Sequence, residues 1–416
     1  MRLFTFKIKR LIYPGVKNQS SETLGIGLAG KPGEELGPLT ETRAKAAVPF
    51  GGQYRIIDFT LSNALHSGLR KLLVLTQYKS HSLHKHLRDG WSIFNPELGE
   101  YITTVPPQMR TDEFWYQGTA DALLQNLYLI ERSGCDYVII LPGDHIYRMD
   151  YAPVLEFHKE KQADLTVITT TELNNNSGHT IQMDEDNRVS AFSISGSKET
   201  SQSMTEKFST GAYIFSTAYL ISLINNHIAK ETPWLEDIIQ TVTSTDKVYA
   251  YEFGGSMGRV SQDRYWRVLH SLDDYYAASM DLLKYEQPLN LYQPDWLIRS
   301  YVGQHPPART APGDYGNEGI FINSIIGSGS VITGSSVQNS ILFNNVVVKD
   351  EAVVHSSIIF DDVIIGKNCQ IENCIIEKDV VIPNKAVIGV DLKHDRKSFE
   401  ITNKGLRLIP KGFNNF

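Results

Sequence analysis

The segments LFNNVVVKDEAVV (342–354), IFDDVIIGKNCQI (359–371) and IEKDVVIPNKAVI (376–388) decide the fold of the C-terminal part of the chain. In each segment an aliphatic residue recurs at steps of six, and Ile326 and Ile332 extend the same step upstream. The three complete triplets are Leu342, Val348 and Val354, then Ile359, Ile365 and Ile371, then Ile376, Ile382 and Ile388. A period of six grouped in threes predicts a left-handed parallel β-helix of hexapeptide repeats, with one triangular coil per triplet.

We expect this β-helix over residues 316–400, with about four coils. An ordinary small sandwich is the alternative, but its strands would alternate apolar and polar residues with a period of two. Residues 286–315 contain five prolines and have no periodicity, which predicts a linker in front of the repeats.

Upstream of the linker, short apolar runs alternate with amphipathic segments of helix length. The apolar runs are TLGIGLAG, KLLVLTQ, YVIILPGDH and DLTVITTT, and the helical segments lie near 58–68, 119–133 and 151–162. Strands that alternate with helices predict an α/β domain over residues 20–285, with a mostly parallel, Rossmann-like sheet. Such sheets bind ligands outside the carboxyl ends of their strands, so the loops after LGIGLAG and YVIILPGD are the candidate site.

Composition excludes several classes of protein. The chain has 416 residues, 41% of them hydrophobic, three cysteines and a net charge of −7. These values are typical of a globular protein and argue against a disulfide scaffold and a nucleic-acid binder. No apolar run is long enough to cross a membrane, and no Cys/His cluster has zinc spacing. We therefore expect a cytoplasmic protein with reduced cysteines.

The loop after the first strand is rich in glycine. Gly30, Lys31 and Gly33 follow LGIGLA directly, and glycines at this place let backbone N–H groups approach a phosphate. This pattern predicts a nucleotide-binding loop, although glycines at these positions are also typical of a plain tight turn. Segments elsewhere in the chain favour the nucleotide-binding loop.

Four further segments follow one another in a recognisable order: RIIDFTLSN (55–63), WYQGTADALLQN (115–126), LPGDHIYRMDY (141–151) and STGAYIF (209–215). Together with the repeats they make the chain resemble the glucose-1-phosphate adenylyltransferase family, also called ADP-glucose pyrophosphorylase. The resemblance implies that ATP and α-glucose 1-phosphate give ADP-glucose and pyrophosphate, for glycogen or starch synthesis. It also implies Mg²⁺ bound with ATP, and tetramers built partly through the β-helix.

The resemblance also assigns roles to individual residues. Asp144 matches the family's metal-binding and catalytic Asp, Arg43 and Lys45 match basic positions near the phosphates, and Gln77 matches a nucleotide contact. The positions that match substrate contacts are Tyr116, Gly118, Thr119, Asp121, Gly178 and Ser209.

Several charged positions of the family are replaced. Where the family has two arginines in its glycine-rich loop, this chain has Pro32 and Glu35. The family's sugar-phosphate Lys is Ser195, its second metal-binding Asp is Val268, and a Lys that often precedes RAK is Thr42. Four of these departures, Pro32, Glu35, Ser195 and Val268, fall at phosphate or metal positions and predict weak catalysis or none.

Three hypotheses follow. The first is a catalytically impaired or regulatory subunit, in a homo-tetramer or in a hetero-tetramer with an intact paralogue. The second is a working enzyme that uses Asp144, Lys31, Arg43 and Lys45 as replacement charges. The third is an acyltransferase that uses His355 in the β-helix, which would leave RIIDFTLSN and QGTAD unexplained.

Overall fold

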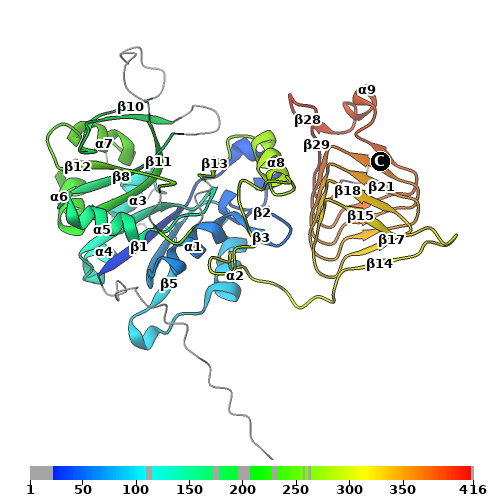
Figure 1. The fold of residues 1–416 in the computed structure, drawn as a ribbon, viewed down its shortest axis with the longest axis horizontal. Coiled ribbons are helices and arrows are strands. Elements are labelled where there is room, and N and C mark those ends of the chain that lie inside the picture. Colours follow the sequence, from blue (N-terminus) through cyan, green and yellow to red (C-terminus); the bar gives the residue numbers. More distant parts are fainter. Residues whose placement is uncertain are drawn as a thin grey trace, which may run out of the picture.

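The computed structural model describes residues 22–108, 115–171, 178–194, 207–226, 232–255, 258–260 and 264–413. Figure 1 shows two domains side by side, an α/β domain and a β-helix, with helix α8 (Leu272–Asp281) on the side of the α/β domain that faces the β-helix. Both predicted architectures are therefore present.

The α/β domain is built on a mixed sheet in the order β10-β9-β11-β6-β1-β4-β5, with β8 paired to β11 and β12 paired to β8. Its strands are β1 (Thr23–Ala29), β4 (Lys71–Thr76), β5 (Tyr101–Val105), β6 (Tyr137–Pro142), β8 (Leu165–Thr170), β9 (His179–Met183), β10 (Val189–Ile194), β11 (Lys207–Ser216) and β12 (Val248–Glu252). The prediction of a parallel sheet holds for β6, β1, β4 and β5. The other half differs because β9 and β10 form a hairpin and β11 runs antiparallel to β6, β8 and β9.

Helices cover this sheet, and short strands add two small ribbons. The helices are α1 (Ile56–His66), α2 (His81–Trp91), α3 (Thr119–Gln125), α4 (Leu127–Ser133), α5 (Ala152–Glu160), α6 (Thr217–Asn226) and α7 (Leu235–Val242), with 3₁₀ helices η2 (Glu34–Thr40), η3 (Lys45–Ala47) and η4 (Pro96–Leu98). The ribbons pair β2 (Pro49–Phe50) with β3 (Tyr54–Arg55), and β7 (His145–Tyr147) with β13 (Trp266–Val268). Across the ranges given above, no helix is both long and apolar enough to span a membrane.

The repeats form three parallel sheets that share one core. The first sheet contains β14 (Arg309–Ala311), β17 (Val331–Thr333), β20 (Val347–Val348), β23 (Ile364–Ile365) and β26 (Val381–Ile382). The second contains β15 (Ile320–Ile322), β18 (Ser336–Gln338), β21 (Val353–His355), β24 (Gln370–Glu372) and β27 (Val387–Ile388). The third contains β16 (Ile325–Ile326), β19 (Ile341–Leu342), β22 (Ile358–Ile359), β25 (Cys374–Ile376) and β29 (Arg407–Ile409), and β28 (Glu400–Ile401) pairs with β29 at its edge. The short helix α9 (Leu392–Asp395) follows β27.

The register explains why the step of six predicts the coils. Val348, Ile365 and Ile382 are direct partners in one sheet, and all three are buried. The corners between strands carry Asn345 and Asp362 at φ of 58° and 61°, a left-handed conformation that Asn and Asp tolerate best among residues other than glycine.

The segment predicted as a linker is packed against the α/β domain. Trp296 is buried, and its Nε1 donates to Asn63 Oδ1 of α1 at 3.1 Å. Ser300 Oγ donates to Asp58 Oδ2 at 2.6 Å. The last part of the segment supplies β14, the first strand of the β-helix. The connection therefore fixes the two domains to each other.

Candidate active site

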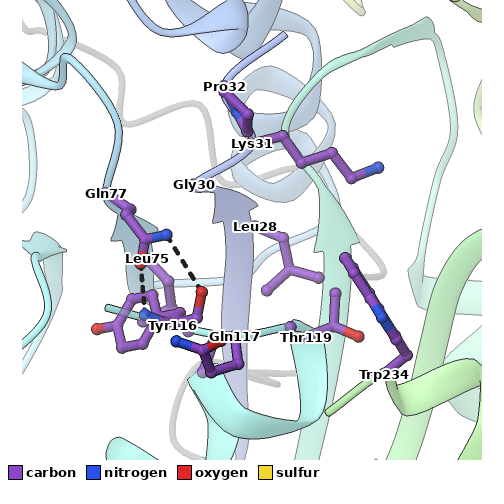
Figure 2. Close-up of a pocket in the computed structure, with 12 residues that line it drawn as sticks. Leu28, Gly30, Lys31, Pro32, Leu75, Gln77, Tyr116, Gln117, Thr119 and Trp234 are labelled. Atoms are coloured by element: carbon purple, nitrogen blue, oxygen red, sulfur yellow. Dashed lines mark hydrogen bonds between the residues drawn. The ribbon is translucent and has the colours of Figure 1, made fainter. Parts of the chain in front are cut away.

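A cleft opens at the carboxyl ends of β1 and β6, where parallel sheets bind ligands. It consists of two adjoining cavities of about 120 and 280 Å³. Both cavities are lined by Leu28, Lys31, Thr119 and Trp234. Figure 2 shows the smaller cavity, with Gln77 and Tyr116 on one side and Trp234 on the other. The predicted nucleotide loop and the QGTAD segment therefore face each other across one cleft.

Asp144 lines the larger cavity, and its carboxylate lies beside the ammonium groups of Lys31, which also lines the cavity, and of Lys45, which is not among the lining residues. Lys45 Nζ is 3.3 Å and Lys31 Nζ is 3.6 Å from Asp144 Oδ2. Asp144 and Lys45 are buried, whereas the side chain of Lys31 is 56% exposed. Burial by itself would raise the pKa of Asp144, but the charges of Lys31 and Lys45 outweigh it and hold this pKa far below its ordinary value. Asp144 is thus an anion at neutral pH, and it raises the pKa of Lys31.

Lys45 is also paired with Glu35, the residue that stands in place of an expected arginine. The distance from Lys45 Nζ to Glu35 Oε1 is 2.6 Å. Gly33 lets the loop close over Lys45, because its φ is +77° and a Cβ there would be 2.7 Å from Lys45 Cβ. Lys45 therefore shares its charge between two carboxylates, which weakens its attraction for a phosphate.

Position 268 lies beside His145, the residue that follows Asp144. Val268 on β13 is the antiparallel partner of His145 on β7, and His145 directly follows Asp144. Register partners point to the same face of a two-stranded ribbon. A carboxylate at position 268 would therefore stand next to His145, where this chain has an aliphatic side chain.

The QGTAD segment is fixed to β4 by Gln77. Gln77 Nε2 donates to the carbonyl of Tyr116 at 3.2 Å, and the Tyr116 N–H donates to Gln77 Oε1 at 2.6 Å, as drawn in Figure 2. The Tyr116 hydroxyl accepts a hydrogen bond from Asn126 Nδ2 at 2.9 Å. Gln77 and Tyr116 line the smaller cavity, and the two hydrogen bonds between them fix its shape.

Gly118, Thr119 and Asp121 hold the segment that precedes α7. The carbonyl of Pro233 accepts from Ala120 N at 2.8 Å, and it packs against Gly118. Thr119 Oγ1 accepts from the N–H of Leu235 at 2.8 Å and donates to Glu236 Oε2 at 3.2 Å. Asp121 Oδ2 accepts from Gln117 N and Gln125 Nε2 within its own segment. These contacts position Trp234 and Glu236 on the wall of the cleft.

Gly118→Ala should disrupt this wall. A Cβ at residue 118 would lie 2.3 Å from the Pro233 carbonyl oxygen, so one of the two segments has to move. We expect a loss of about 1–3 kcal/mol in the free energy of unfolding, together with weaker binding of nucleotide. Denaturant unfolding measures the first effect and calorimetric titration the second. Gly255→Ala is the control, because a Cβ there would be 3.8 Å from the nearest atom, and equal effects of both variants would contradict the prediction.

Arg43, a predicted catalytic residue, reaches the second domain. Its Nη1 and Nη2 donate to Glu377 Oε1 and Oε2 at 2.7 and 3.0 Å, and both side chains are buried. Glu377 directly follows β25 of the β-helix. In this arrangement the guanidinium belongs to an interdomain ion pair, and Arg43 is not among the residues that line the two cavities described above. Its predicted contact with a phosphate stays a prediction.

The remaining predicted residues lie near the larger cavity or beyond the described ranges. Ser209 is buried on β11, with Oγ 3.2 Å from the Tyr213 hydroxyl. Gly178 precedes β9, and its neighbour His179 lines the larger cavity. Ser195 lies outside the described residues.

The sequence also matches known protein families. The family model for nucleotidyl transferases matches residues 24–285, and the model for the GlmU-like C-terminal hexapeptide domain matches residues 306–409. A curated relative from Vibrio parahaemolyticus, glucose-1-phosphate adenylyltransferase 2, is 52% identical, covering 94% of this chain and 99% of its own. The chain belongs to the glucose-1-phosphate adenylyltransferase family. The protein of the same name from Vibrio cholerae is 48% identical with 94% and 98% coverage, and the glucose-1-phosphate adenylyltransferase of Methylococcus capsulatus is 39% identical with 95% and 94% coverage.

As in other nucleotidyl transferases, Mg²⁺ is the expected metal, and the residues fit it only in part. Asp144 Oδ2 is buried and accepts no hydrogen bond within the described ranges, so it has a free lone pair for a metal. However, Lys31 and Lys45 flank this oxygen, and position 268 supplies no second carboxylate. No group of three or more His, Cys, Asp or Glu side chains in the described part of the chain is placed to hold a metal ion.

Reasoning from the sequence missed three residues of the cleft. Trp234, Glu236 and His179 line the larger cavity together with Asp144. The sequence did contain one signal for this wall of the cleft, because Trp234 is a large aromatic residue that follows Pro233 and directly precedes a helical pattern. In the structure Trp234 is 48% exposed. Glu236 adds a carboxylate opposite Lys31, whose pKa it helps to raise.

Proposed function

We propose that the chain binds ATP and glucose 1-phosphate in the cleft between β1, β6 and α7, and that it acts in glycogen biosynthesis as a catalytically impaired or regulatory member of its family. The cytoplasm, which supplies both substrates, is the compartment we propose for it. Gln77 and Tyr116 would frame the nucleotide end of the cleft, and Asp144, Lys31 and Ser209 the end that holds the sugar phosphate.

The reaction of the family defines what an active site has to supply. A phosphate oxygen of glucose 1-phosphate attacks the α-phosphorus of ATP, and the bond from that phosphorus to the oxygen of the leaving pyrophosphate breaks. No covalent enzyme intermediate is needed, so catalysis depends on alignment of the reactants and on positive charge around the phosphate oxygens.

One observation carries the proposal of impaired catalysis: two basic side chains that were predicted to lie near the phosphates, Arg43 and Lys45, are paired with carboxylates of the chain itself. Lys45 is 2.6 Å from Glu35 and 3.3 Å from Asp144, so this cation already serves two carboxylates. Arg43 is bonded to Glu377. Lys31 is the more exposed of the two ammonium groups beside Asp144.

Asp144 is the residue that would hold Mg²⁺. When bound with ATP, the metal supplies positive charge that offsets the charge of the phosphates. Because position 268 is Val, oxygens of ATP and water would have to complete its coordination, which Mg²⁺ tolerates. We expect Mg²⁺ to enter with the nucleotide and to bind weakly without it.

The purified chain alone should release pyrophosphate from ATP and glucose 1-phosphate roughly a thousandfold more slowly than an intact family member. The assay contains Mg²⁺ and a sugar-phosphate activator, and ATP binding is measured in parallel by calorimetry. Binding without turnover supports the proposal. A rate within tenfold of the intact enzyme would instead favour a working enzyme in which the exposed Lys31 replaces the missing arginine.

We further propose that the chain assembles into tetramers, either with itself or with an intact paralogue whose response to effectors it modifies. The β-helix that family tetramers use is complete here, which supports this assembly. Co-expression with an intact paralogue, followed by affinity capture on one tagged chain and mass measurement of the complex, tests it. Recovery of homomeric complexes alone would argue against the mixed assembly.

A further inference from the structure

His145 is a buried residue of the cleft to which the resemblance assigns no role. It follows Asp144 on β7 and lines the larger cavity. Its Nδ1 is 3.2 Å from Trp266 Nε1, which comes from the partner strand β13. The two rings meet edge to face, with centroids 6.0 Å apart.

The contact with Trp266 decides which nitrogen of His145 carries the proton. An indole N–H can only donate, so His145 Nδ1 has to accept and is unprotonated. A histidine ring whose Nδ1 accepts this bond is neutral, and its proton is on Nε2.

Trp266 is well placed to keep this hydrogen bond. Its indole is buried and stacks on Tyr147, with ring centroids 3.8 Å apart and an angle of 25° between the planes. Phe253 packs against it edge to face at 5.2 Å. The direction of the indole N–H is thus fixed from two sides.

The Nε2–H group of His145 has no acceptor of its own in the described part of the protein. Asp144 Oδ1 is 3.6 Å away, which is longer than a hydrogen bond. Position 268, the register partner of His145, offers an aliphatic side chain where a carboxylate could have accepted. Because His145 lines the larger cavity, this N–H group is available to a ligand there.

We propose that His145 donates a hydrogen bond from Nε2 to a phosphate oxygen of the bound ligand, and that Trp266 is the positioning residue that keeps the proton on this nitrogen. The proposal rests on the proposed function, because it assumes that the same cleft holds ATP or glucose 1-phosphate. A neutral donor adds a phosphate contact in a site whose buried cation, Lys45, is already paired with carboxylates.

Calorimetric titration of the full chain with ATP and, separately, with glucose 1-phosphate tests the contact. His145→Leu keeps similar volume but has no donor, and we expect roughly ten- to hundredfold weaker binding of the ligand whose phosphate it contacts. His145→Gln retains an N–H donor at nearly the same reach and should stay close to wild type. The two titrations show which phosphate is bound. Wild-type affinity of His145→Leu for both ligands would overturn the proposal.

Raman difference spectra test the role of Trp266, since the ring vibrations of a neutral histidine distinguish its two tautomers. The difference between wild type and His145→Gln isolates His145, and we expect the tautomer with the proton on Nε2. Trp266→Phe keeps an aromatic ring but removes the N–H, so both tautomers should appear and ligand binding should weaken several-fold. A merely structural Trp266 would change thermal stability and leave the tautomer unchanged. A wild-type proton on Nδ1 would overturn the assignment.

The outcomes separate this proposal from the proposed function. If the wild-type chain binds neither ligand, the proposed function fails, and the phosphate contact of His145 fails with it. If the wild type binds and His145→Leu binds equally well, only the contact fails. Should His145→Leu not fold, as judged by circular dichroism, Trp266→Phe retains His145 and decides the question by its affinity and its tautomer.

Discussion

Changing Pro32→Arg, Ser195→Lys and Val268→Asp together should raise the rate of pyrophosphate release by roughly a thousandfold or more. Each change returns a charge to a position where the resemblance expects one. Residue 32 adjoins Lys31 at the cleft, and residue 268 is the register partner of His145. Residue 195 lies outside the described residues, and its place in the variant rests on the resemblance. The rate is measured with ATP, glucose 1-phosphate and Mg²⁺.

The matched control replaces Val268 by Asn and keeps the other two changes. Asn has nearly the shape of Asp but no negative charge, so the Mg²⁺ contribution should be absent while the arginine and lysine remain. We expect the single variants to gain little, because groups that act on one transition state are strongly non-additive. An inactive triple variant that still folds and binds ATP would mean that other positions limit catalysis, with Glu35 the first to change.

The β-helix could be predicted from sequence because its geometry is local and repeated. Each coil places Leu342, Val348 and Val354, or their equivalents, toward one axis, so burial appears in the sequence as a step of six. The mixed half of the α/β sheet could not be predicted in the same way. β8 and β11 are both apolar runs, and burial on both faces does not reveal whether neighbouring strands run parallel or antiparallel.

The location of the cleft was also predictable, but several roles within it were not. Asp144 follows an apolar strand, and the rule for parallel sheets places it at the ligand edge. Gly118 and Thr119 instead depend on Pro233 and Leu235, more than a hundred positions later in the sequence. No periodicity links residues that meet through a loop, so these contacts, like those of Trp234 and Glu236, require the structure.

Arg43→Met should destabilise the protein by about 3–5 kcal/mol, because it leaves Glu377 buried without its partner. The carboxylate of Glu377 is 2% exposed and accepts two hydrogen bonds from Arg43, whose side chain is 7% exposed. The pair lies beside an apolar cluster that joins the domains through residues such as Phe50, Tyr275 and Phe360. Denaturant unfolding, followed by signals from both domains, measures the loss.

The double variant Arg43→Met, Glu377→Leu separates the cost of a lone charge from the value of the ion pair. Replacing both partners by apolar side chains removes the buried charge, so most of the lost stability should return. Lys159→Met breaks the exposed pair with Glu22 and should cost less than about 1 kcal/mol. If the double variant is as unstable as Arg43→Met, the ion pair itself holds the domains together. If the double variant is stable and still binds ATP with wild-type affinity, Arg43 acts at the domain interface and is not needed to bind the nucleotide.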